Sequence, residues 1–309
     1  MTQPQRILVV GSVALDSIRT PYGEVKDALG GSASYFSFSA SHFAPVSVVA
    51  VVGDDFPKEH RARFEDRGVD LSGLETAAGG TFRWRGEYMA ELGHAHTLET
   101  QLNVFADFHP KLDESHRKAP YVFLANIDPD LQLEVLSQMK KPTLTLSDTM
   151  NYWIARKPDR VFEVLRKVDV ALLNEEEARA LAGETHLAKA AEKLLEAGAN
   201  AVIIKKGEHG ALYHSREERF ITPAYPVTAL TDPTGAGDSF AGGFIGMLAR
   251  FGRTDGEALR QAMACGTAMA SLAIESFSPT RLIETGTDEI DGRVRALNGM
   301  VHYDLFPMF

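Results

Sequence analysis

The sequence predicts an α/β fold: a doubly wound, mostly parallel sheet that is flanked by helices and carries a small β-sheet lid. Three observations predict it. Short apolar runs alternate with helical patterns in the first two thirds of the chain, two long helical stretches follow, and one segment alternates polar with apolar residues. Continuous apolar runs are typical of parallel strands buried on both faces, and strands that alternate with helices build parallel sheets.

The predicted elements follow one another in a regular order. The apolar runs predict strands over 7–10, 47–52, 121–124, 143–146, 168–173 and 201–204. Apolar residues at helical spacing predict helices over 32–42, 57–67, 130–139, 159–166, 175–182 and 187–197. Two longer helices, over 236–251 and 256–274, are expected to cover the sheet.

The lid is predicted by a change of pattern. Residues 81–92 and 95–105 alternate in polarity and are joined at Gly93-His94, which is typical of a β-hairpin with one exposed face. With residues 18–28, this hairpin is expected to form a small sheet over the carboxyl ends of the main strands, where ligands of such folds bind. We therefore expect one domain over 1–309, with a β lid formed by about 15–29 and 81–106 that keeps water out of the site.

Composition limits the class of protein. The chain has 309 residues, of which 44% are hydrophobic, enough to bury a large core. A formal net charge of −10 disfavours nucleic-acid partners, which are bound through Lys and Arg. The single cysteine, Cys265, excludes an internal disulfide and a cysteine-rich zinc site, and it favours a cytoplasmic location. No apolar run has the length of a membrane span, and the first is too short for a signal peptide.

A glycine-rich turn before the first long helix is the most informative motif. It reads Asp232-Pro233-Thr234-Gly235-Ala236-Gly237-Asp238. Small residues let backbone N–H groups point toward one spot, where the helix dipole also favours a phosphate. Asp238, placed beside such a spot, is suited to take a proton from a hydroxyl as a general base. The alternative is that Asp238 only caps the helix and the glycines only form a tight turn.

The turn resembles the D-T-x-G-A-G-D signature of the ribokinase-like (PfkB) carbohydrate and nucleoside kinases. Three further segments are similar to motifs of the same family. Gly30-Gly31 resembles its N-terminal glycine signature, Asn174 with Glu177 resembles its N-x-x-E motif, and residues 205–210 resemble its nucleotide-side glycine loop. The resemblance covers the whole chain, and the four motifs occur in the family's order.

The resemblance implies a ribokinase-like fold, ATP as the phosphoryl donor and Mg²⁺ as helper. It implies that Asp238 activates an acceptor hydroxyl and that Gly235, Ala236 and Gly237 line the anion hole. In some relatives a monovalent cation binds at the position of Asp232. An NAD-dependent oxidoreductase is disfavoured, because residues 9–14 do not supply G-x-G-x-x-G after the first strand.

Candidate donor-side residues follow two of the predicted strands. Asn174 and Glu177 are expected near the nucleotide, with Glu177 acting on Mg²⁺ partly through water; the alternative is a helix-capping pair. Lys205 is expected to meet the donor phosphates, Gly207 to let its loop approach the nucleotide, and Thr234 to contact the nucleotide from the turn. Asp148 is expected either to organise metal-bound water or to cap the helix that starts near residue 151.

Candidate acceptor-side residues lie in the first third of the chain. Asp16 is suited to accept hydrogen bonds from two sugar hydroxyls, and the paired Gly30 and Gly31 admit a ligand close to the backbone. Asn103, in the second hairpin arm, is expected to contact the substrate from the lid or to be an exposed strand residue. Tyr35 departs from the family, where many relatives carry Asn, so the known ribose and fructose contacts cannot be carried over.

The sequence thus predicts an ATP- and Mg²⁺-dependent kinase of a small-molecule sugar or polyol hydroxyl. A nucleoside kinase is the alternative, and a non-catalytic ligand-binding regulator is a third reading, disfavoured by the intact Asp238. A homodimer through the lid sheets is also expected, because a small sheet with one apolar face favours a partner.

Overall fold

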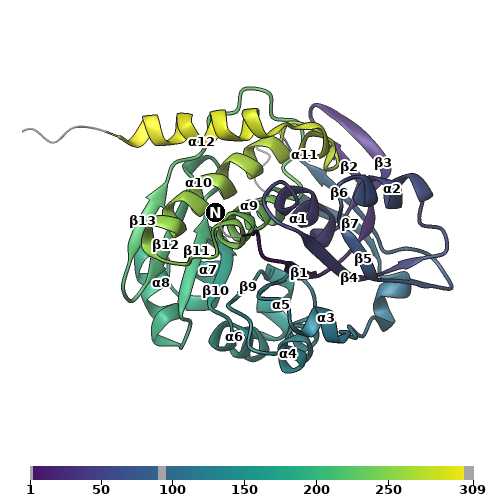
Figure 1. Ribbon diagram of the computed structural model, residues 1–309, viewed down its shortest axis with the longest axis horizontal. Coiled ribbons are helices and arrows are strands. Elements are labelled where there is room, and N and C mark those ends of the chain that lie inside the picture. The colour runs from purple at the N-terminus through teal and green to yellow at the C-terminus, as the bar shows by residue number, and fades with distance from the viewer. Residues whose placement is uncertain (1–2, 90–94, 303–309) are drawn as a thin grey trace, which may run out of the picture.

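The computed structural model describes residues 3–89 and 95–302. Within these residues, nine strands form the main sheet (Figure 1). From edge to edge they are β13 (Arg219–Thr222), β12 (Ala211–Ser215), β11 (Ala201–Lys205), β10 (Val170–Asn174), β9 (Leu144–Ser147), β8 (Tyr121–Leu124), β1 (Ile7–Val10), β4 (Val46–Gly53) and β5 (Asp70–Ala77). Strands β11 to β5 pair in parallel, and β12 and β13 complete the sheet as an antiparallel hairpin.

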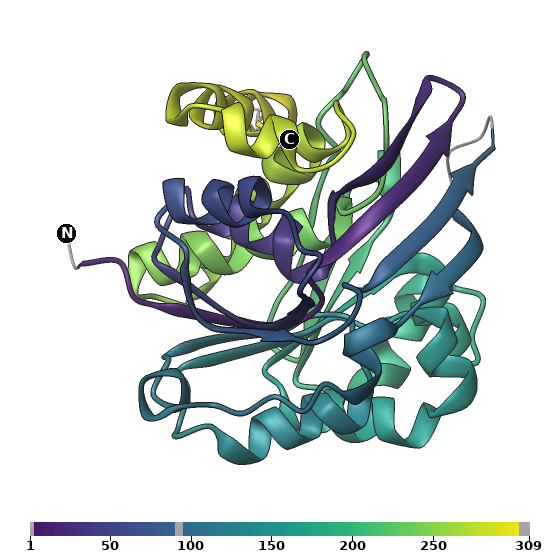
Figure 2. The ribbon, with the colours of Figure 1, turned by 90° about the vertical axis from the view of Figure 1, so that its right-hand side faces the viewer.

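Helices cover both faces of the main sheet, so the molecule has three layers (Figure 2). One face is covered by α1 (Ser32–Ala40), α2 (Lys58–Asp66), α9 (Ala236–Phe251), α10 (Gly256–Ala273), α11 (Thr280–Glu284) and α12 (Thr287–Val301). The other face is covered by α4 (Pro129–Gln138), α5 (Asn151–Arg156), α6 (Pro158–Lys167), α7 (Glu175–Ala182) and α8 (Leu187–Glu196), with the short α3 (Glu114–Arg117) nearby.

The alternation of side chains along each strand divides the core in two. In β1, Ile7 and Val9 belong to the cluster under α1, α9 and α10, and Leu8 and Val10 belong to the cluster on the opposite face. Residues of a strand point to alternate faces, so both faces of a buried strand must be apolar. This is why β1 reads as an uninterrupted apolar run.

A second, smaller sheet stands beyond the carboxyl ends of the parallel strands (Figure 2). We refer to it as the small sheet; its strands are β3 (Gly23–Gly30), β2 (Ala14–Thr20), β6 (Arg83–Tyr88) and β7 (Ala95–Gln101), in this order. The predicted β6–β7 hairpin is confirmed by antiparallel pairing; its predicted turn at Gly93-His94 lies outside the described residues.

Two hydrogen bonds fix the small sheet to the C-terminal part of the chain. The Oγ1 of Thr20 donates to the carbonyl of Thr231 over 2.9 Å, and the Oγ of Ser278 donates to the carbonyl of Leu29 over 2.5 Å. Strand β2 is thus held against the segment that leads into the glycine-rich turn, and β3 against the segment that follows α10.

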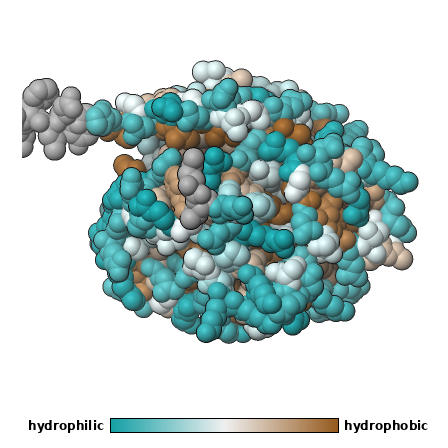
Figure 3. Space-filling model, viewed as in Figure 1, coloured by the Kyte–Doolittle hydropathy of each residue, from teal (hydrophilic) through white to brown (hydrophobic). Residues whose placement is uncertain are grey.

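The described helices and surface agree with the composition. No helix within residues 3–89 and 95–302 combines the length and hydropathy that a membrane crossing requires. The face seen in Figure 3 is mainly hydrophilic, with smaller hydrophobic areas between the polar ones.

Most predicted elements are confirmed within one or two residues at each end. The prediction missed the edge strand β5, the last strand β13, and the helices α3, α11 and α12. It was wrong about the end of the hairpin: β7 stops at Gln101, and residues Asn103–Asp107 form a 3-10 helix, η1. Asn103 takes a φ of +48°, which is incompatible with an extended strand.

Candidate active site

The turn before α9 has the geometry of an anion site. Gly235 precedes the helix with a φ of +75°, a left-handed conformation that favours glycine. The N–H of Thr234 donates to Oδ1 of Asp232 over 2.9 Å and closes the turn. No side chain of the described residues hydrogen-bonds at the cap position of α9. The N–H of Ala236 donates to the carbonyl of Pro233 over 3.2 Å, so an anion would meet the remaining N–H groups of the first turn and the positive end of the helix dipole.

Asp238 lies in the first turn of α9 and stays partly accessible. The cap position of α9 is Gly235, so the alternative in which Asp238 only caps the helix is wrong. Burial raises the pKa of the Asp238 carboxyl well above its usual range; the carboxylate of Asp148 raises it further, and the ammonium of Lys205 partly offsets this. A carboxylate with a raised pKa is a stronger base than an exposed aspartate.

Lys205 and Asp148 form an ion pair next to the glycine-rich turn. They lie at the carboxyl ends of β11 and β9, on either side of β10, and the Nζ of Lys205 donates to Oδ2 of Asp148 over 2.6 Å. A Cβ added at Gly237 would lie 2.9 Å from this Nζ, so only glycine lets the ammonium come so close to the turn. Asp148 does not cap α5, whose cap position is Met150; that alternative was wrong, because the carboxylate is held by Lys205 and the N–H of Thr149.

Asn174 and Glu177 form the capping box that the sequence left open. The N–H of Glu177 donates to Oδ1 of Asn174 over 2.9 Å, and the N–H of Asn174 donates to Oε2 of Glu177 over 2.7 Å. Both residues still lie at the carboxyl end of β10, between Lys205 and Asp148. Burial, followed by the neighbouring Asp148 carboxylate, raises the pKa of Glu177 above its usual range.

Asp16 lies on β2, at the base of the small sheet. Its carboxylate is 4% exposed and accepts the N–H of Gly31 over 3.3 Å. A Cβ at Gly30 would lie 1.9 Å from Oδ2 of Asp16, so Gly30 makes room for this carboxylate. Gly31 has a φ of +91°, and a Cβ there would lie 2.5 Å from the carbonyl oxygen of Ser12. Burial raises the pKa of Asp16 to about 7, and Asp232 adds to the increase.

Thr234 and Gly207, which are both predicted to contact the nucleotide, lie in different surroundings. The hydroxyl of Thr234 is 3.0 Å from the hydroxyl of Tyr88 on β6. Gly207 begins a short 3-10 helix, η2 (Gly207–His209), with a φ of +54°, and a Cβ there would meet open space. Thr234 is thus in hydrogen-bond contact with the small sheet, whereas the space beside Gly207 is open.

Asn103 is placed apart from the strand in which it was expected. Its amide donates to the carbonyl of Thr81 over 2.8 Å, and its side chain packs against Gly80. The amide therefore has a partner within the protein, and it supports the segment that leads into β6.

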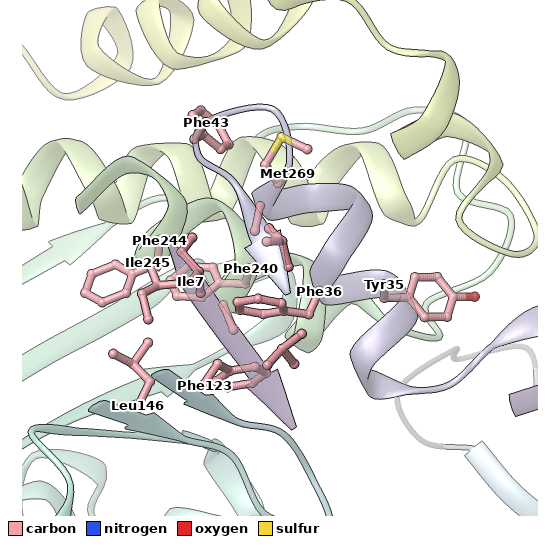
Figure 4. Close-up of a cluster of buried hydrophobic side chains, with 14 of the residues drawn as sticks. Ile7, Tyr35, Phe36, Phe43, Phe123, Leu146, Phe240, Phe244, Ile245 and Met269 are labelled. Atoms are coloured by element: carbon pink, nitrogen blue, oxygen red, sulfur yellow. The ribbon is translucent and has the colours of Figure 1, made fainter. Parts of the chain in front are cut away.

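Two tyrosines enter the site without having been assigned to it from the sequence. Tyr88 is the last residue of β6 and contacts Thr234. Tyr35, on α1, is 2% exposed, and its ring lies directly on Gly235, since a Cβ there would be 2.2 Å from its Cγ. Figure 4 shows its ring turned away from Phe36 and Phe123 in the core. Its departure from the family pattern was the only signal available in the sequence.

Comparison with known proteins identifies the family. The model of the pfkB family of carbohydrate kinases matches residues 4–286. A cytidine kinase of Thermococcus kodakarensis is 30% identical over 250 residues, which cover 79% of this chain and 88% of that protein. An ATP-dependent ribose-1-phosphate kinase of Halopiger xanaduensis is 28% identical over 258 residues, covering 81% and 83%.

Solved structures support the fold. A putative ribokinase II from E. coli, crystallised with ATP and Mg²⁺, superimposes with a TM-score of 0.76 at 21% identity and covers 94% of this chain and 99% of its own. The nine-stranded sheet with its smaller second sheet is therefore the ribokinase-like fold. From the match over nearly the whole sequence, the chain belongs to the pfkB family of carbohydrate kinases, phosphotransferases that act on an alcohol group.

Proposed function

We propose that this kinase transfers the γ-phosphoryl group of ATP to a hydroxyl of a sugar, a polyol or a nucleoside, with Asp238 as the general base. One observation carries the proposal: a partly accessible carboxylate of raised pKa lies in the first turn of α9, beside Gly235–Gly237 and the ammonium of Lys205. A base and an anion site thus adjoin, and phosphoryl transfer to a hydroxyl needs both.

The chain's own groups divide the work. Asp238 takes the proton of the acceptor hydroxyl as that oxygen attacks the γ-phosphorus. The N–H groups of Gly235, Ala236 and Gly237 stabilise the charge on the transferring group, and Lys205 holds the donor phosphates. Such stabilisation is effective because the donors are already in position before the reaction begins.

The donor side has the character of a Mg²⁺ site. Glu177 and Asp148 are buried carboxylates close enough for Asp148 to raise the pKa of Glu177, and a divalent cation would relieve that repulsion. Within residues 3–89 and 95–302, no three His, Cys, Asp or Glu side chains cluster as a metal site, which suits Mg²⁺ that keeps several waters. Glu177 and Asp148 would hold the ion through water, and it would neutralise charge on the ATP phosphates.

Asn174, Thr234 and Gly207 complete the proposed nucleotide contacts. The E. coli relative that was crystallised with ATP and Mg²⁺ supports this choice of donor and metal. A monovalent cation is proposed at Asp232, whose buried Oδ2 has no hydrogen-bond partner among the described residues.

The acceptor side favours an uncharged molecule. Asp16 and Asp232 are 4% and 0% exposed, and within the described residues neither forms an ion pair with Lys or Arg. A phosphorylated or carboxylated acceptor would meet these buried acids without a cation to balance it. Gly30 and Gly31 would admit a polyhydroxylated ring beside Asp16. The proposed contact between Asn103 and the acceptor has less support, because the Asn103 amide already donates to the carbonyl of Thr81.

The acceptor is either a sugar or polyol, or a nucleoside. A sugar or polyol is the first expectation from the motifs. The similarity to a cytidine kinase over most of both chains favours a nucleoside instead. Four exposed hydrophobic residues on or beside the small sheet, Tyr22, Met89, Leu98 and Leu102, also support the proposed homodimer.

The test is an ATP-dependent phosphorylation screen over ribose, fructose, inositols, adenosine, cytidine and inosine. Asp238→Asn is expected to lower kcat by about 10²-fold or more, since general base catalysis supplies a factor of this order, with ATP binding retained. Asp255→Asn, at the N-terminus of α10 and remote from the turn, is the matched control. Turnover by Asp238→Asn at the wild-type rate would refute the assignment; ATP binding without turnover of any acceptor would favour the regulator.

A further inference from the structure

The hydroxyl of Tyr35 is a buried polar group for which the described residues offer no partner. The hydroxyl oxygen is buried, and it neither donates nor accepts a hydrogen bond within residues 3–89 and 95–302. Buried hydroxyls in native proteins nearly always have a partner. This group therefore calls for an explanation outside the side chains of residues 3–89 and 95–302.

The ring of Tyr35 is fixed in place. It lies against Gly235, so that a Cβ on that glycine would be 2.2 to 2.5 Å from three ring atoms. The neighbouring Phe36 stacks on Phe123 in the core, with ring centroids 4.5 Å apart, and Figure 4 shows Tyr35 pointing away from this stack. Helix α1 thus buries Phe36 in the core and holds the preceding residue, Tyr35, against the turn that precedes Asp238.

The Tyr35 hydroxyl lies among the residues that are proposed to surround the acceptor. The groups that act on it electrostatically are Asp232, Asp16, Tyr88 and Asp238. Burial and these carboxylates raise the pKa of Tyr35 well above its usual range, so the phenol keeps its proton and remains a donor. Asp16, by contrast, is suited to accept hydrogen bonds when ionised. Together they offer one donor and one acceptor to a ligand that lies next to Asp238.

We infer that Tyr35 is a specificity-determining residue, whose hydroxyl donates a hydrogen bond to an oxygen of the uncharged polyhydroxylated acceptor beside Asp16. This inference rests on the proposed kinase function. An amide at this position, as in many relatives, would offer two donors and an acceptor. The phenol offers a single hydroxyl on a rigid ring, so it selects a narrower set of acceptors.

The test compares Tyr35→Phe with Tyr121→Phe. Both remove one buried phenolic hydroxyl. That of Tyr121 donates to the carbonyl of Leu248 over 3.3 Å, at the amino end of β8 and away from the site. The probes are cytidine and D-ribose, together with 2′-deoxycytidine, 3′-deoxycytidine and 2-deoxy-D-ribose, and each variant is measured for kcat, both KM values and Tm.

Tyr35→Phe is expected to raise the acceptor KM about 3- to 10-fold, the effect of one hydrogen bond. Its KM for ATP and its Tm without acceptor stay at the wild-type values, because no group among the described residues loses a partner. Against the deoxy analogue that lacks the contacted hydroxyl, the variant and the wild type have the same KM. Tyr121→Phe gives the opposite pattern: a lower Tm and an unchanged acceptor KM.

An unchanged acceptor KM in Tyr35→Phe, or a Tm that falls as in Tyr121→Phe, would overturn the inference, since the hydroxyl then binds water or serves the fold. Failure of the proposed function looks different. In that case the wild type itself turns over none of the acceptors, and the inference about Tyr35 falls with it.

Discussion

The hydroxyl groups of Tyr88 and Thr234 lie 3.0 Å apart, which joins the last residue of β6 to the turn that precedes Asp238. They are separated by 146 residues in sequence. Because Tyr88 belongs to the small sheet and Thr234 to the main domain, their contact links the position of this sheet to the geometry of the anion site.

Removing this contact is expected to loosen the small sheet over the acceptor. In Tyr88→Phe, kcat/KM for the acceptor should fall about 3- to 10-fold, the effect of one hydrogen bond. ADP release without acceptor should rise, because water then reaches the site more often. The measurement compares ADP release with and without acceptor. Tyr22→Phe, an exposed tyrosine between β2 and β3, is the control; equal effects in both variants would contradict a latch between Tyr88 and Thr234.

The Lys205 ammonium is expected to bind the donor phosphates. Replacing it in Lys205→Met should raise the KM for ATP about 10-fold or more, since hydrogen bonds to charged groups contribute more than neutral ones. The adjacent Lys206→Met is the matched control and should leave this KM unchanged. Steady-state kinetics at varied ATP decide the matter, and similar values for the two variants would show that Lys205 is not a phosphate ligand.

The same substitution tests the ion pair with Asp148. Lys205→Met leaves two buried carboxylates, Asp148 and Glu177, without their cation. Breaking a buried pair from one side costs about 3 kcal/mol of unfolding free energy. The double variant with Asp148→Asn should recover part of that loss, because the unpaired charge is gone. Urea unfolding of the three proteins measures it, and additive losses would argue against a pair that matters for stability.

The contribution of Asp16 and Asp232 to stability should fall as pH rises from about 4 to about 7. Burial raises the pKa of Asp16 to about 7 and that of Asp232 to about 6. A carboxyl whose pKa is higher in the folded than in the unfolded chain holds its proton longer when folded. It therefore stabilises the fold below the unfolded value, and this contribution disappears as pH rises through the folded value.

The size of this effect can be measured on Asp16. Its shift corresponds to about 2 to 4 kcal/mol over the window. Carboxyls of lowered pKa, such as Asp70 and Asp55, finish titrating below this range. Burial lowers the pKa of His42 to about 4, so this residue contributes with the opposite sign as pH rises, and the comparison of Asp16→Asn with the wild type removes its effect. Urea unfolding at intervals from about pH 5 to about pH 7.5 should give a smaller decline for Asp16→Asn than for the wild type. The prediction fails if the free energy of unfolding changes with pH in the same way in Asp16→Asn and in the wild type.

The fold was largely predictable from the sequence because its strands are buried on both faces. β1 and α9 match their predicted bounds, since their apolar patterns have no competing interpretation. β5 was missed because it lies at the edge of the sheet, where Asp70 and Glu75 interrupt the apolar residues.

The site was predictable only where its residues are close in sequence. The Asn174–Glu177 capping box spans three residues and was one of two stated alternatives. The Lys205–Asp148 pair spans 57 residues and depends on the order of β9 and β11 in the sheet. The place of the Tyr35 ring against Gly235 also depends on tertiary packing, so no local pattern indicates it.

The capping box leaves one question that a single substitution answers: whether Glu177 also serves Mg²⁺. Glu177→Gln keeps the box, because glutamine reaches back to the N–H of Asn174 as glutamate does, but it removes the negative charge. If Glu177 acts on the metal, the Mg²⁺ concentration for half-maximal activity should rise about 10-fold, the effect of losing a partner that orients the ion, while Tm stays within a degree or two. Glu177→Ala loses both properties, so it should show the same change in Mg²⁺ dependence together with a loss of about 1 kcal/mol in stability. A titration with Mg²⁺ and thermal unfolding of both variants separate the two roles. An unchanged Mg²⁺ dependence in Glu177→Gln would mean that the residue serves the helix alone.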